Sequence, residues 1–339
     1  MTIMKTTPVI LAATLGTMLL AGCERPPVDS EQVGYRGTAM VQVNNPRLAT
    51  EIVVPEAAPP APQAGPKAGD IYQNVQVLGD LSIAEFTRTM AAITEWVSPE
   101  EGCNYCHIPT NLASDDIYTK VVSRRMLQMT RNINSEWTDH VADTGVTCYT
   151  CHAGKPVPEY IWFTDASEEG ASNFAGNRNG QNIAAPSAGY SSLPGDPFTA
   201  LLTEQDGPSI RVLSTDWAPG SGEANIMDTE HTYALMMHMS GALGVNCTYC
   251  HNSNNFADWG TGRTQRVTAW HGINMVQYLN EDYLIPLGPV YPDNRLGPLG
   301  DAPKAYCSTC HAGLPKPLGG AKMAADYPGL LPQSAPQSQ

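Results

Sequence analysis

The sequence is short of phenylalanine and of positive charge, and each shortage limits what the chain can be. Only five of its 339 residues are Phe, although hydrophobic cores usually depend on large aromatic side chains. Lys and Arg together number 19 against 33 Asp and Glu, which gives a formal net charge of -14. An acidic surface argues against nucleic-acid binding and favours either a basic protein partner or simple solubility. The chain is long enough to enclose a substantial core, so something other than Phe must fill it.

The N-terminal apolar run is too short for a membrane-spanning helix. Residues 8–20 are mostly apolar, but a spanning helix needs roughly 20 such residues. Lys5 precedes the run and Leu20-Ala-Gly-Cys23 ends it, which is the pattern of a bacterial export signal of the lipoprotein type. We therefore predict a cleaved signal over residues 1–22 and a lipid anchor on Cys23. An ordinary signal peptide and an uncleaved anchor helix are the alternatives. We expect the protein to sit on the outer face of a membrane.

Eight of the nine cysteines form four pairs, and a histidine directly follows each pair. The four Cys-x-x-Cys-His motifs are Cys103-Cys106-His107, Cys148-Cys151-His152, Cys247-Cys250-His251 and Cys307-Cys310-His311. Cysteines at i and i+3 can form thioethers to the two vinyl groups of one porphyrin, and the adjacent His then reaches the iron as its fifth ligand. A zinc site does not need a His after every pair, and a thiol redox pair would not recur four times. The motifs predict a c-type cytochrome with four haem c groups, attached outside the cytoplasm.

Four porphyrins would also account for the missing aromatic residues, because each is a large flat apolar body. We therefore expect the haems to form most of the core. A haem with both axial positions filled transfers electrons, whereas an open iron invites small-molecule chemistry. The function consequently depends on the sixth ligands.

The chain contains an internal repeat of a two-haem unit. The first motif is followed by Asn111-Leu-Ala-Ser and the third by Asn255-Phe-Ala-Asp. In each half a helical stretch then ends at an asparagine, Asn134 or Asn280, before a second motif that continues with Ala-Gly. This duplication predicts two pseudo-symmetric dihaem segments around four haems.

A helix is expected before each motif. The first begins at a capping box, Ser82 with Glu85, and its apolar residues recur at helical spacing. The third ends at Gly244, a residue type that suits a helix C-terminus. The remaining patterns predict helices over residues 122–133, 229–243 and 267–280. The predicted fold class is mainly α with long irregular loops and few or no strands.

Composition divides the chain into segments. Residues 54–68 are rich in Pro and Ala and should be extended and semi-rigid. Residues 164–192 are rich in Gly, Asn and Ser and should be an irregular connection, and the C-terminal tail resembles them and should lie on the surface. The predicted divisions are an export signal (1–22), an N-terminal anchor with the extended segment (23–70), a first dihaem segment (71–160), a connecting segment (161–226), a second dihaem segment (227–318) and a C-terminal tail (319–339).

Methionines on the predicted helices are candidate sixth ligands. Met90 lies 13 residues before the first motif and Met236 lies 11 before the third, with the adjacent Met237 as an alternative. For the second haem either Met126 or Met129 could serve.

The repeat favours Met126 at the second haem. Aligning the two halves at their helix-ending asparagines places Met129 opposite Met275 but Met126 opposite Gly272. A Met that occupies the same position in both halves fits a role in core packing better than a role as an iron ligand. The unmatched pair indicates that the second and fourth haems are ligated differently.

If Gly272 leaves space at the fourth iron, a group from elsewhere must fill it. His140 is the best candidate, because it lies in a short amphipathic stretch, Trp137 to Val141. The other spare histidines, each expected to be a surface or hydrogen-bonded residue, are His231, His238 and His271. Lys120 and Arg266 also coincide in the repeat, where they could pair with haem propionates or remain exposed and solvated.

These residues resemble the tetrahaem cytochrome subunit of the photosynthetic reaction centres of purple bacteria. The resemblance covers nearly the whole chain and includes the Cys23 lipoprotein site. Its longest strings are Glu85-Phe-Thr-Arg-Thr-Met-Ala-Ala-Ile-Thr-Glu-Trp-Val-Ser-Pro99, Arg124-Arg-Met126, Gly145-Val-Thr-Cys-Tyr-Thr-Cys-His152 and Ala234-Leu-Met236-Met.

The resemblance implies Met90, Met126 and Met236 as sixth ligands of the first three haems, and His140 opposite His311 at the fourth. It also implies a lipid-anchored seat on the periplasmic face of the inner, photosynthetic membrane, against the L and M subunits. The implied function is to take electrons from a soluble cytochrome c or a high-potential iron-sulfur protein and to re-reduce the photo-oxidised bacteriochlorophyll pair, as an electron carrier and not an enzyme. Because a second His lowers the potential of a haem relative to Met, the fourth haem should be among the low-potential ones.

Two other functions fit the motifs without the resemblance. A multihaem reductase would need an iron with an open sixth position, which a high-spin fraction in the absorption spectrum would reveal. A periplasmic electron shuttle unrelated to photosynthesis would not copurify with bacteriochlorophyll.

Overall fold

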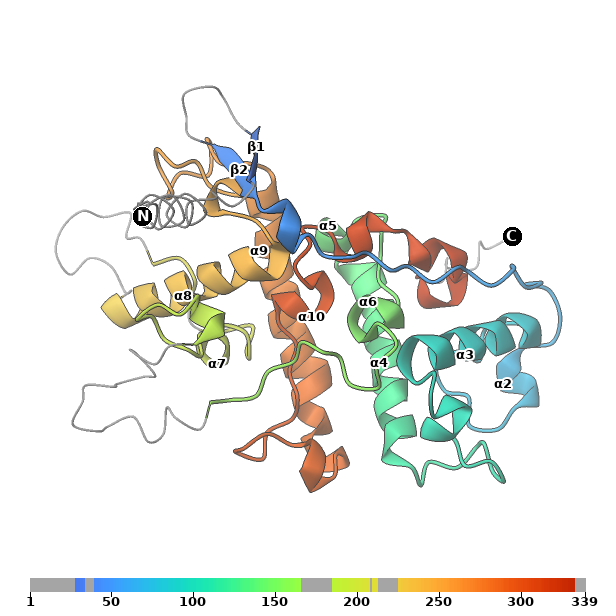
Figure 1. Ribbon diagram of the computed structural model, residues 1–339. Helices are drawn as coiled ribbons and strands as arrows, with labels where there is room; N and C mark the ends of the chain where they lie inside the picture. The colour runs from blue at the N-terminus through green and yellow to red at the C-terminus, as the bar shows by residue number, and fades with distance from the viewer. Residues whose placement is uncertain (1–27, 34–39, 166–184, 208, 213–224, 333–339) are drawn as a thin grey trace, which may run out of the picture.

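The computed structural model describes residues 28–33, 40–165, 185–207, 209–212 and 225–332. The predicted export signal and Cys23 therefore lie outside the described residues, as do residues 166–184 of the predicted connecting segment. Within the described ranges the chain is mainly helical with long loops, as predicted, and two short strands form a small sheet (Figure 1).

A long helix precedes each motif, as the sequence predicts. These helices are α3 (Ile83–Val97), α4 (Tyr118–Glu136), α8 (Ile226–Leu243) and α9 (Gln265–Tyr278). α9 continues into a π-helical turn, η6 (Leu279–Leu284), and then a 3-10 segment, η7 (Ile285–Val290). None of the helices in the described ranges is both long enough and apolar enough to cross a bilayer.

Short helical turns complete the secondary structure. The short α-helices are α2 (Ala68–Ile71), α5 (Thr138–Val141), α6 (Cys148–His152), α7 (Phe198–Leu201) and α10 (Cys307–His311). The other 3-10 turns are η1 (Pro46–Leu48), η2 (Gly102–Tyr105), η4 (Pro186–Ala188), η5 (Cys247–Tyr249), η8 (Asp293–Arg295), η9 (Pro317–Gly320), η10 (Met323–Asp326) and η11 (Pro328–Leu330).

Local capping explains two of the helix ends. The Ser82 hydroxyl accepts a hydrogen bond from the backbone N–H of Glu85 at 3.1 Å and starts α3. Only this half of the predicted capping box forms, because the Glu85 carboxylate pairs with Arg88 at 3.1 Å. Gly244 ends α8 in the left-handed conformation, with a φ of 63°. A Cβ there would lie 2.3 Å from the Gly313 carbonyl oxygen, so glycine is required on both counts.

The second motif of each half packs on the helix that precedes the first. α6 lies against α3, α10 lies against α8, and α6 and α10 also touch each other. A main-chain hydrogen bond of 2.8 Å joins each pair: Gly154 donates to the Trp96 carbonyl, and Gly313 donates to the Ala242 carbonyl. α3, α6, α10 and α8 therefore form a continuous row across the molecule (Figure 1).

An asparagine ties the long helix of each half to the motif that follows it. Asn134 donates to the Val146 carbonyl at 3.0 Å and accepts from the Val146 N–H at 2.7 Å. Asn280 makes the same pair of bonds with Ala305, at 2.9 and 2.8 Å, and also donates to the Leu202 carbonyl at 2.8 Å. The duplicated asparagines thus have the same structural role.

Buried apolar side chains of the described residues gather in three separate clusters. The first joins α7, α8 and α9 and contains Trp162, Phe198, Leu201, Leu202, Leu235, Ile273 and Val276. The second joins α4 to α9 and η6 and contains Ile133, Val146, Met275, Leu279, Tyr283 and Leu284. The third joins α3 to the C-terminal residues and contains Ala92, Trp96, Met323, Tyr327 and Leu330. The protein part of the core is therefore divided among the helix contacts.

The predicted surface position of the C-terminal tail is wrong for residues 323–330. Tyr327 and Leu330 are 2% and 0% exposed, and the Tyr327 ring meets Trp96 edge-on at a centroid distance of 4.7 Å. The Arg88 guanidinium lies 4.0 Å over the same ring and donates to the Asp326 carbonyl at 2.7 Å. The likeness of the tail to residues 164–192 indicated an irregular segment, and it forms only short 3-10 turns, but its Tyr and Leu side chains cover the apolar face of α3.

The N-terminal hairpin binds the third motif. Strands β1 (Asp29–Gln32) and β2 (Val41–Asn44) pair antiparallel. The side chain of Asn246, directly before the third motif, donates to the Val41 carbonyl at 2.6 Å and accepts from the Val43 N–H at 3.2 Å. Thr248 inside the motif donates to the same Val41 carbonyl at 2.8 Å.

Residues 45–66, which we call the strap, run from this hairpin to α3 at the other end of the row (Figure 1). Apart from η1, the strap has no helix or strand up to residue 64. Its far end is held by Arg88, which donates to the carbonyls of Ala58 and Pro59 at 2.7 and 2.8 Å, and by Ser82, which donates to Pro62. The predicted extended segment is therefore fastened to the folded body.

Replacing Asn280 by Ala should destabilise the protein. The side chain is fully buried. Its loss leaves the Leu202 carbonyl and the Ala305 N–H without their partner, at about 1–3 kcal/mol each, whereas the Ala305 carbonyl keeps its bond from Trp162 Nε1. We expect the midpoint of thermal unfolding, followed by far-UV circular dichroism, to fall by about 5 °C or more. The control Asn294→Ala, at an exposed position of η8, should leave the midpoint nearly unchanged. Equal shifts in the two variants would contradict the structural role of Asn280.

Candidate haem sites

The first and third motifs share one geometry. The first cysteine of each lies in a 3-10 turn, η2 or η5, which follows the end of α3 or α8, and the second cysteine comes directly after the turn. His107 donates from Nδ1 to the Leu112 carbonyl, and His251 donates from Nδ1 to the Phe256 carbonyl, at 3.0 Å in both cases. Each acceptor lies five residues after its histidine.

The second and fourth motifs share a different geometry. Each forms one turn of α-helix, α6 or α10, that ends at an alanine in the left-handed conformation, Ala153 with a φ of 47° or Ala312 with a φ of 46°. His152 and His311 donate from Nδ1 to the carbonyl three residues on, at 2.9 Å in both cases. The repeat seen in the sequence therefore extends to the hydrogen bonds of the motifs.

All four motif histidines present the same ring nitrogen. A backbone carbonyl only accepts hydrogen bonds, so Nδ1 carries the proton and Nε2 keeps the lone pair that a metal needs. Burial lowers the pKa of His311 to about 4 and also lowers the pKa of His152 and His251. Burial therefore favours the neutral form of these three imidazoles, which fits the predicted role as iron ligands.

The thiols do not have the properties of a redox-active pair. Burial raises the pKa of Cys148 and Cys307 to about 12 and the pKa of Cys250 to about 11. Thiol redox motifs need the opposite shift, because the thiolate is the reactive form. These cysteines fit covalent attachment to a porphyrin better than thiol exchange.

His140 lies opposite His311, and Gly272 makes room for its ring. The His140 and His311 ring centroids are 6.0 Å apart, and His140 Nδ1 donates to the Thr268 carbonyl at 2.9 Å. A Cβ on Gly272 would lie 2.5 Å from His140 Cε1. Two ring nitrogens that are each about 2 Å from one metal ion lie about 4 Å apart, with ring centroids about 6 Å apart. The spacing of the two rings therefore suits two ligands of one iron.

Met90 and Met236 lie half-buried on α3 and α8, the helices that precede their motifs. Met236 packs against the first apolar cluster. Its neighbour Met237 points to η4, where a Cβ on Gly189 would lie 2.8 Å from the Met237 methyl group. This packing distinguishes the two adjacent methionines and favours Met236 as the ligand candidate.

The second haem has two methionine candidates in the same place. Met126 and Met129 both pack against the second apolar cluster. Met275, the repeat partner of Met129, is buried inside that cluster at 6% exposure, as a packing residue should be. Contact with the cluster does not separate Met126 from Met129.

The expectation of a surface or hydrogen-bonded residue is wrong for His238. It is 7% exposed, it stacks on the Tyr306 ring at a centroid distance of 4.5 Å, and its Nε2 has no hydrogen-bond partner within the described ranges. Burial lowers its pKa to about 4. His271 has a different environment, with Nδ1 4.0 Å from an Asp139 carboxylate oxygen.

Lys120 and Arg266 each hold the loop that follows the nearby motif. Lys120 is 9% exposed and donates to the carbonyls of Leu112 and Ser114 at 2.7 and 2.8 Å. Arg266 donates to the Asp258 carbonyl at 2.8 Å. The expectation that Lys120 and Arg266 remain exposed and solvated is therefore wrong for both residues.

The second and fourth motifs meet in the middle of the row, where Cys151 Sγ and Cys310 Sγ are 2.8 Å apart. The first motif lies at the α3 end, and the third lies at the other end beside β2 (Figure 1). The order of the motifs in space is therefore first, second, fourth, third.

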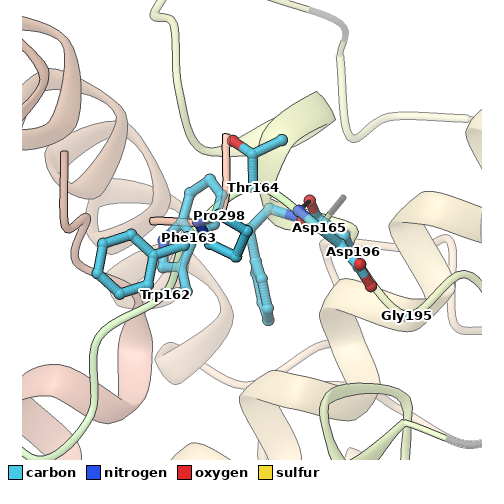
Figure 2. A pocket seen from close by; sticks show the side chains of 8 residues that line it. Trp162, Phe163, Thr164, Asp165, Gly195, Asp196 and Pro298 are labelled. Atoms are coloured by element: carbon cyan, nitrogen blue, oxygen red, sulfur yellow. Dashed lines mark hydrogen bonds between the residues drawn. The ribbon is translucent and has the colours of Figure 1, made fainter. Parts of the chain in front are cut away.

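The structure also contains a cavity of about 360 Å³. Figure 2 shows its walls, which come from the segment Trp162 to Asp165 and from Gly195, Asp196, Phe198 and Pro298. None of these lining residues is a motif residue or a candidate ligand.

The sequence reasoning missed two residues at the third motif. Asn246 binds the N-terminal hairpin about 200 residues earlier in the chain, which no local pattern indicates. Arg263 lies over the Tyr249 ring of the motif, with 5.2 Å between its guanidinium carbon and the ring centre. The sequence signal that could have pointed to Arg263 was its closeness to a second basic residue, Arg266, in a chain whose net charge is -14.

Comparison with known proteins agrees with this arrangement. The family profile described as "Photosynthetic reaction centre cytochrome C subunit" matches residues 24–331. A photosynthetic reaction center cytochrome c subunit of Rubrivivax gelatinosus (strain NBRC 100245 / IL144) is 56% identical over 96% of this chain and 90% of its own length. Proteins of the same name from Thermochromatium tepidum and Roseobacter denitrificans (strain ATCC 33942 / OCh 114) are 49% and 44% identical, over 95% and 97% of this chain and 80% and 94% of their own lengths. The chain therefore belongs to the family of photosynthetic reaction centre cytochrome c subunits.

Proposed function

We propose that this chain carries four haem c groups and conducts electrons from a soluble periplasmic carrier to the photo-oxidised bacteriochlorophyll pair of the reaction centre. The observation that carries the proposal is the continuous row of four motifs, each with a histidine whose Nε2 is free, in a member of this family. Each haem, when bound, supplies a one-electron iron couple. The protein attaches it, fixes its axial ligands and excludes water from it.

The proposed attachment residues are the eight motif cysteines, and the proposed fifth ligands are the four motif histidines. The proposed sixth ligands are Met90, Met126 and Met236 for the first three haems. The different packing of Met236 and Met237 supports Met236 as the third of these ligands. The choice of Met126 over Met129 is supported by the repeat, because Met275, the repeat partner of Met129, is a buried packing residue.

The proposed sixth ligand of the fourth haem is His140. Its Nδ1 bond to Thr268 leaves Nε2 available as a ligand, and the two rings have the spacing that one shared iron requires. Gly272 supports this ligation indirectly, because only a glycine leaves space for the His140 ring.

The chain is proposed to contain two pseudo-symmetric dihaem units. The matched hydrogen bonds of the motif histidines, the matched asparagines 134 and 280, and the matched pairs α3 with α6 and α8 with α10 support this reading. The units meet through α6 and α10, which keeps the row continuous.

The third motif is proposed to face the membrane and the L and M subunits. Strand β1 begins six residues after Cys23, so a lipid on Cys23 would lie at most roughly 20 Å of chain from the hairpin. The hairpin in turn binds Asn246 and Thr248 at the third motif. A lipid anchor at Cys23 would therefore hold this end of the row close to the periplasmic surface of the membrane.

The first motif, at the far end, is proposed to receive electrons. Four exposed carboxylates surround it, from Glu100, Glu101, Asp115 and Asp116. They suit a basic soluble cytochrome c, or the basic face of a high-potential iron-sulfur protein, that is steered to the site by charge.

Flash-induced absorbance changes on membranes test the whole proposal. Light should oxidise the cytochrome haems as the bacteriochlorophyll pair is re-reduced, because electrons leave the row through the third motif. A deletion strain complemented with Cys247→Ala and Cys250→Ala should lose this fast oxidation although the other three haems remain attached. Photo-oxidation of unchanged rate in that strain would refute the exit at the third motif.

Replacing His140 by Met should raise the potential of one haem. Methionine ligation favours ferrous iron more than histidine does, so a redox titration should show one low-potential component moving up, by roughly 100 mV or more. The matched variant His231→Met changes a histidine near the start of α8 that is not a candidate ligand, and it should leave all four components in place.

Gly272→Ala should disturb the same haem without changing a ligand type. The new Cβ would push the His140 ring away from His311, so a high-spin fraction of at most one haem in four should appear in the absorption spectrum. Gly241→Ala is the control, since its Cβ would meet no atom within 4 Å. A low-spin spectrum in Gly272→Ala would count against His140 as ligand.

Neutralising the acidic end should slow reduction by a basic carrier. The triple variant Glu100→Gln, Glu101→Gln, Asp116→Asn should lower the second-order rate constant at low salt by about tenfold and flatten its dependence on ionic strength. Asp29→Asn with Glu31→Gln removes exposed charge at the opposite end of the row and should have little effect. Equal slowing by both variants would place the docking site elsewhere.

A further inference from the structure

The cavity shown in Figure 2 has aromatic side chains at one side and carboxylates at the other. It encloses about 360 Å³, and sites for small molecules in proteins have volumes of roughly 300–1,000 Å³. Trp162 and Phe163 lie opposite Asp165 and Asp196, and the ring of Phe198 also lines the space. An apolar surface and negative charge therefore face the same space.

The aromatic wall is held in place by main-chain and side-chain contacts. Trp162 is 5% exposed, and its main chain exchanges two hydrogen bonds with Lys304, at 3.1 and 3.0 Å. Its indole N–H donates to the Ala305 carbonyl at 3.0 Å. The Phe198 ring packs on the indole with a centroid distance of 5.4 Å. A wall that is fixed in this way loses little conformational freedom when a ligand binds.

A cation already lies against the Trp162 ring. Lys304 Nζ is 4.4 Å from the ring centroid, and this lysine is 3% exposed. The ring therefore accepts a positive charge in this environment, as the electron-rich face of an indole should. The charge of Lys304 is balanced by Asp301, with which it forms an ion pair, so it does little to repel a second cation.

The opposite wall carries a buried carboxylate that has no cation partner. Asp196 is 4% exposed. Its Oδ1 accepts from the N–H groups of Phe198 and Thr199 at 3.0 Å each, and its Oδ2 accepts from the Thr199 hydroxyl at 2.7 Å and the Asp165 N–H at 3.3 Å. All four donors are neutral, and no ion pair between described residues includes Asp196. The carboxylate is thus fixed in position, and no described side chain balances its charge.

The charge of the cavity discriminates between classes of ligand. An acidic group, a haem propionate included, would meet the carboxylates of Asp165 and Asp196 and would be repelled. A neutral ligand would leave the buried charge of Asp196 without a counterion, which is unfavourable. A cation is attracted both by the aromatic rings and by the carboxylates.

We propose that this cavity binds a small organic cation, specifically a quaternary ammonium group, between the aromatic rings and the Asp196 carboxylate. Aromatic rings recognise quaternary ammonium ligands through their electron-rich faces. Such a group has no N–H to donate, which suits a carboxylate whose oxygens already accept four hydrogen bonds. Free choline-type solutes and choline phospholipids both carry this group. The proposal goes beyond electron transfer and does not depend on it.

Isothermal titration calorimetry of the full haem-loaded chain, solubilised in an uncharged detergent, tests the proposal with choline as the probe. Choline should bind. Its neutral carbon isostere, in which a tert-butyl group replaces the trimethylammonium group, should bind at least about tenfold more weakly. The two molecules have nearly the same shape and apolar surface, so the difference in affinity reports the charge.

Two variants place the site in the cavity. Asp196→Asn removes the negative charge but keeps a carbonyl oxygen for the main-chain donors, and it should weaken choline binding about tenfold. Phe163→Leu removes a ring but keeps an apolar side chain, so it should weaken choline binding severalfold and leave the isostere nearly unchanged. Asp116→Asn, at an exposed carboxylate after the first motif, is the matched control and should not change choline binding. If Asp196→Asn fails to fold, Phe163→Leu and the isostere still decide the question.

Competition with a soluble short-chain phosphatidylcholine identifies the source of the cation. Displacement of bound choline would indicate a lipid headgroup, and binding of choline without displacement would indicate a free solute; both results support the site. The proposal would be overturned by the absence of choline binding up to about 10 mM, by equal affinity for the isostere, or by equal weakening in Asp196→Asn and Asp116→Asn.

Discussion

The hydrogen bond from each motif histidine to a main-chain carbonyl is the constraint on which the site depends. It fixes the ring orientation and the tautomer together, because the carbonyl can only accept. The carbonyl comes from a loop five residues on in the first and third motifs and three residues on in the second and fourth. Each loop must therefore close before its histidine can present Nε2 correctly, and the fold around the motifs serves that closure.

Most of the helices and all four motifs could be predicted from the sequence, because their signals are local. The spacing of apolar residues gave the long helices, Ser82 gave the start of α3, and Gly244 gave the end of α8. The position of His140 opposite His311 was also within reach, because the repeat left Gly272 without a methionine partner. That inference depended on Gly272, which has no side chain where the first half has Met126. In the structure the His140 ring occupies the space beside Gly272.

Other features depend on contacts between distant residues and leave no local pattern. The burial of Tyr327 against Trp96 reverses the prediction of a surface tail, because that prediction used the composition of the segment, which describes the backbone and not what the side chains cover. Asn246 binds a hairpin from the start of the chain, and Cys151 approaches Cys310 across the two halves. His238 carried an ordinary expectation for its residue type, and only the three-dimensional structure shows that it is enclosed by Phe198 and Tyr306.

The strap has a consequence for how the molecule is made. The hairpin beside it binds Asn246, and Ala58 donates to the Tyr327 hydroxyl 269 residues later at 3.4 Å. These two attachments wait for residues that are synthesised long after the strap, whereas Arg88 and Ser82 follow it closely in the chain. Contacts between such distant residues form late and slowly. Residues at the start of the chain are therefore among the last to find their place, and the strap is fastened at Tyr327 only once the C-terminal residues have been made.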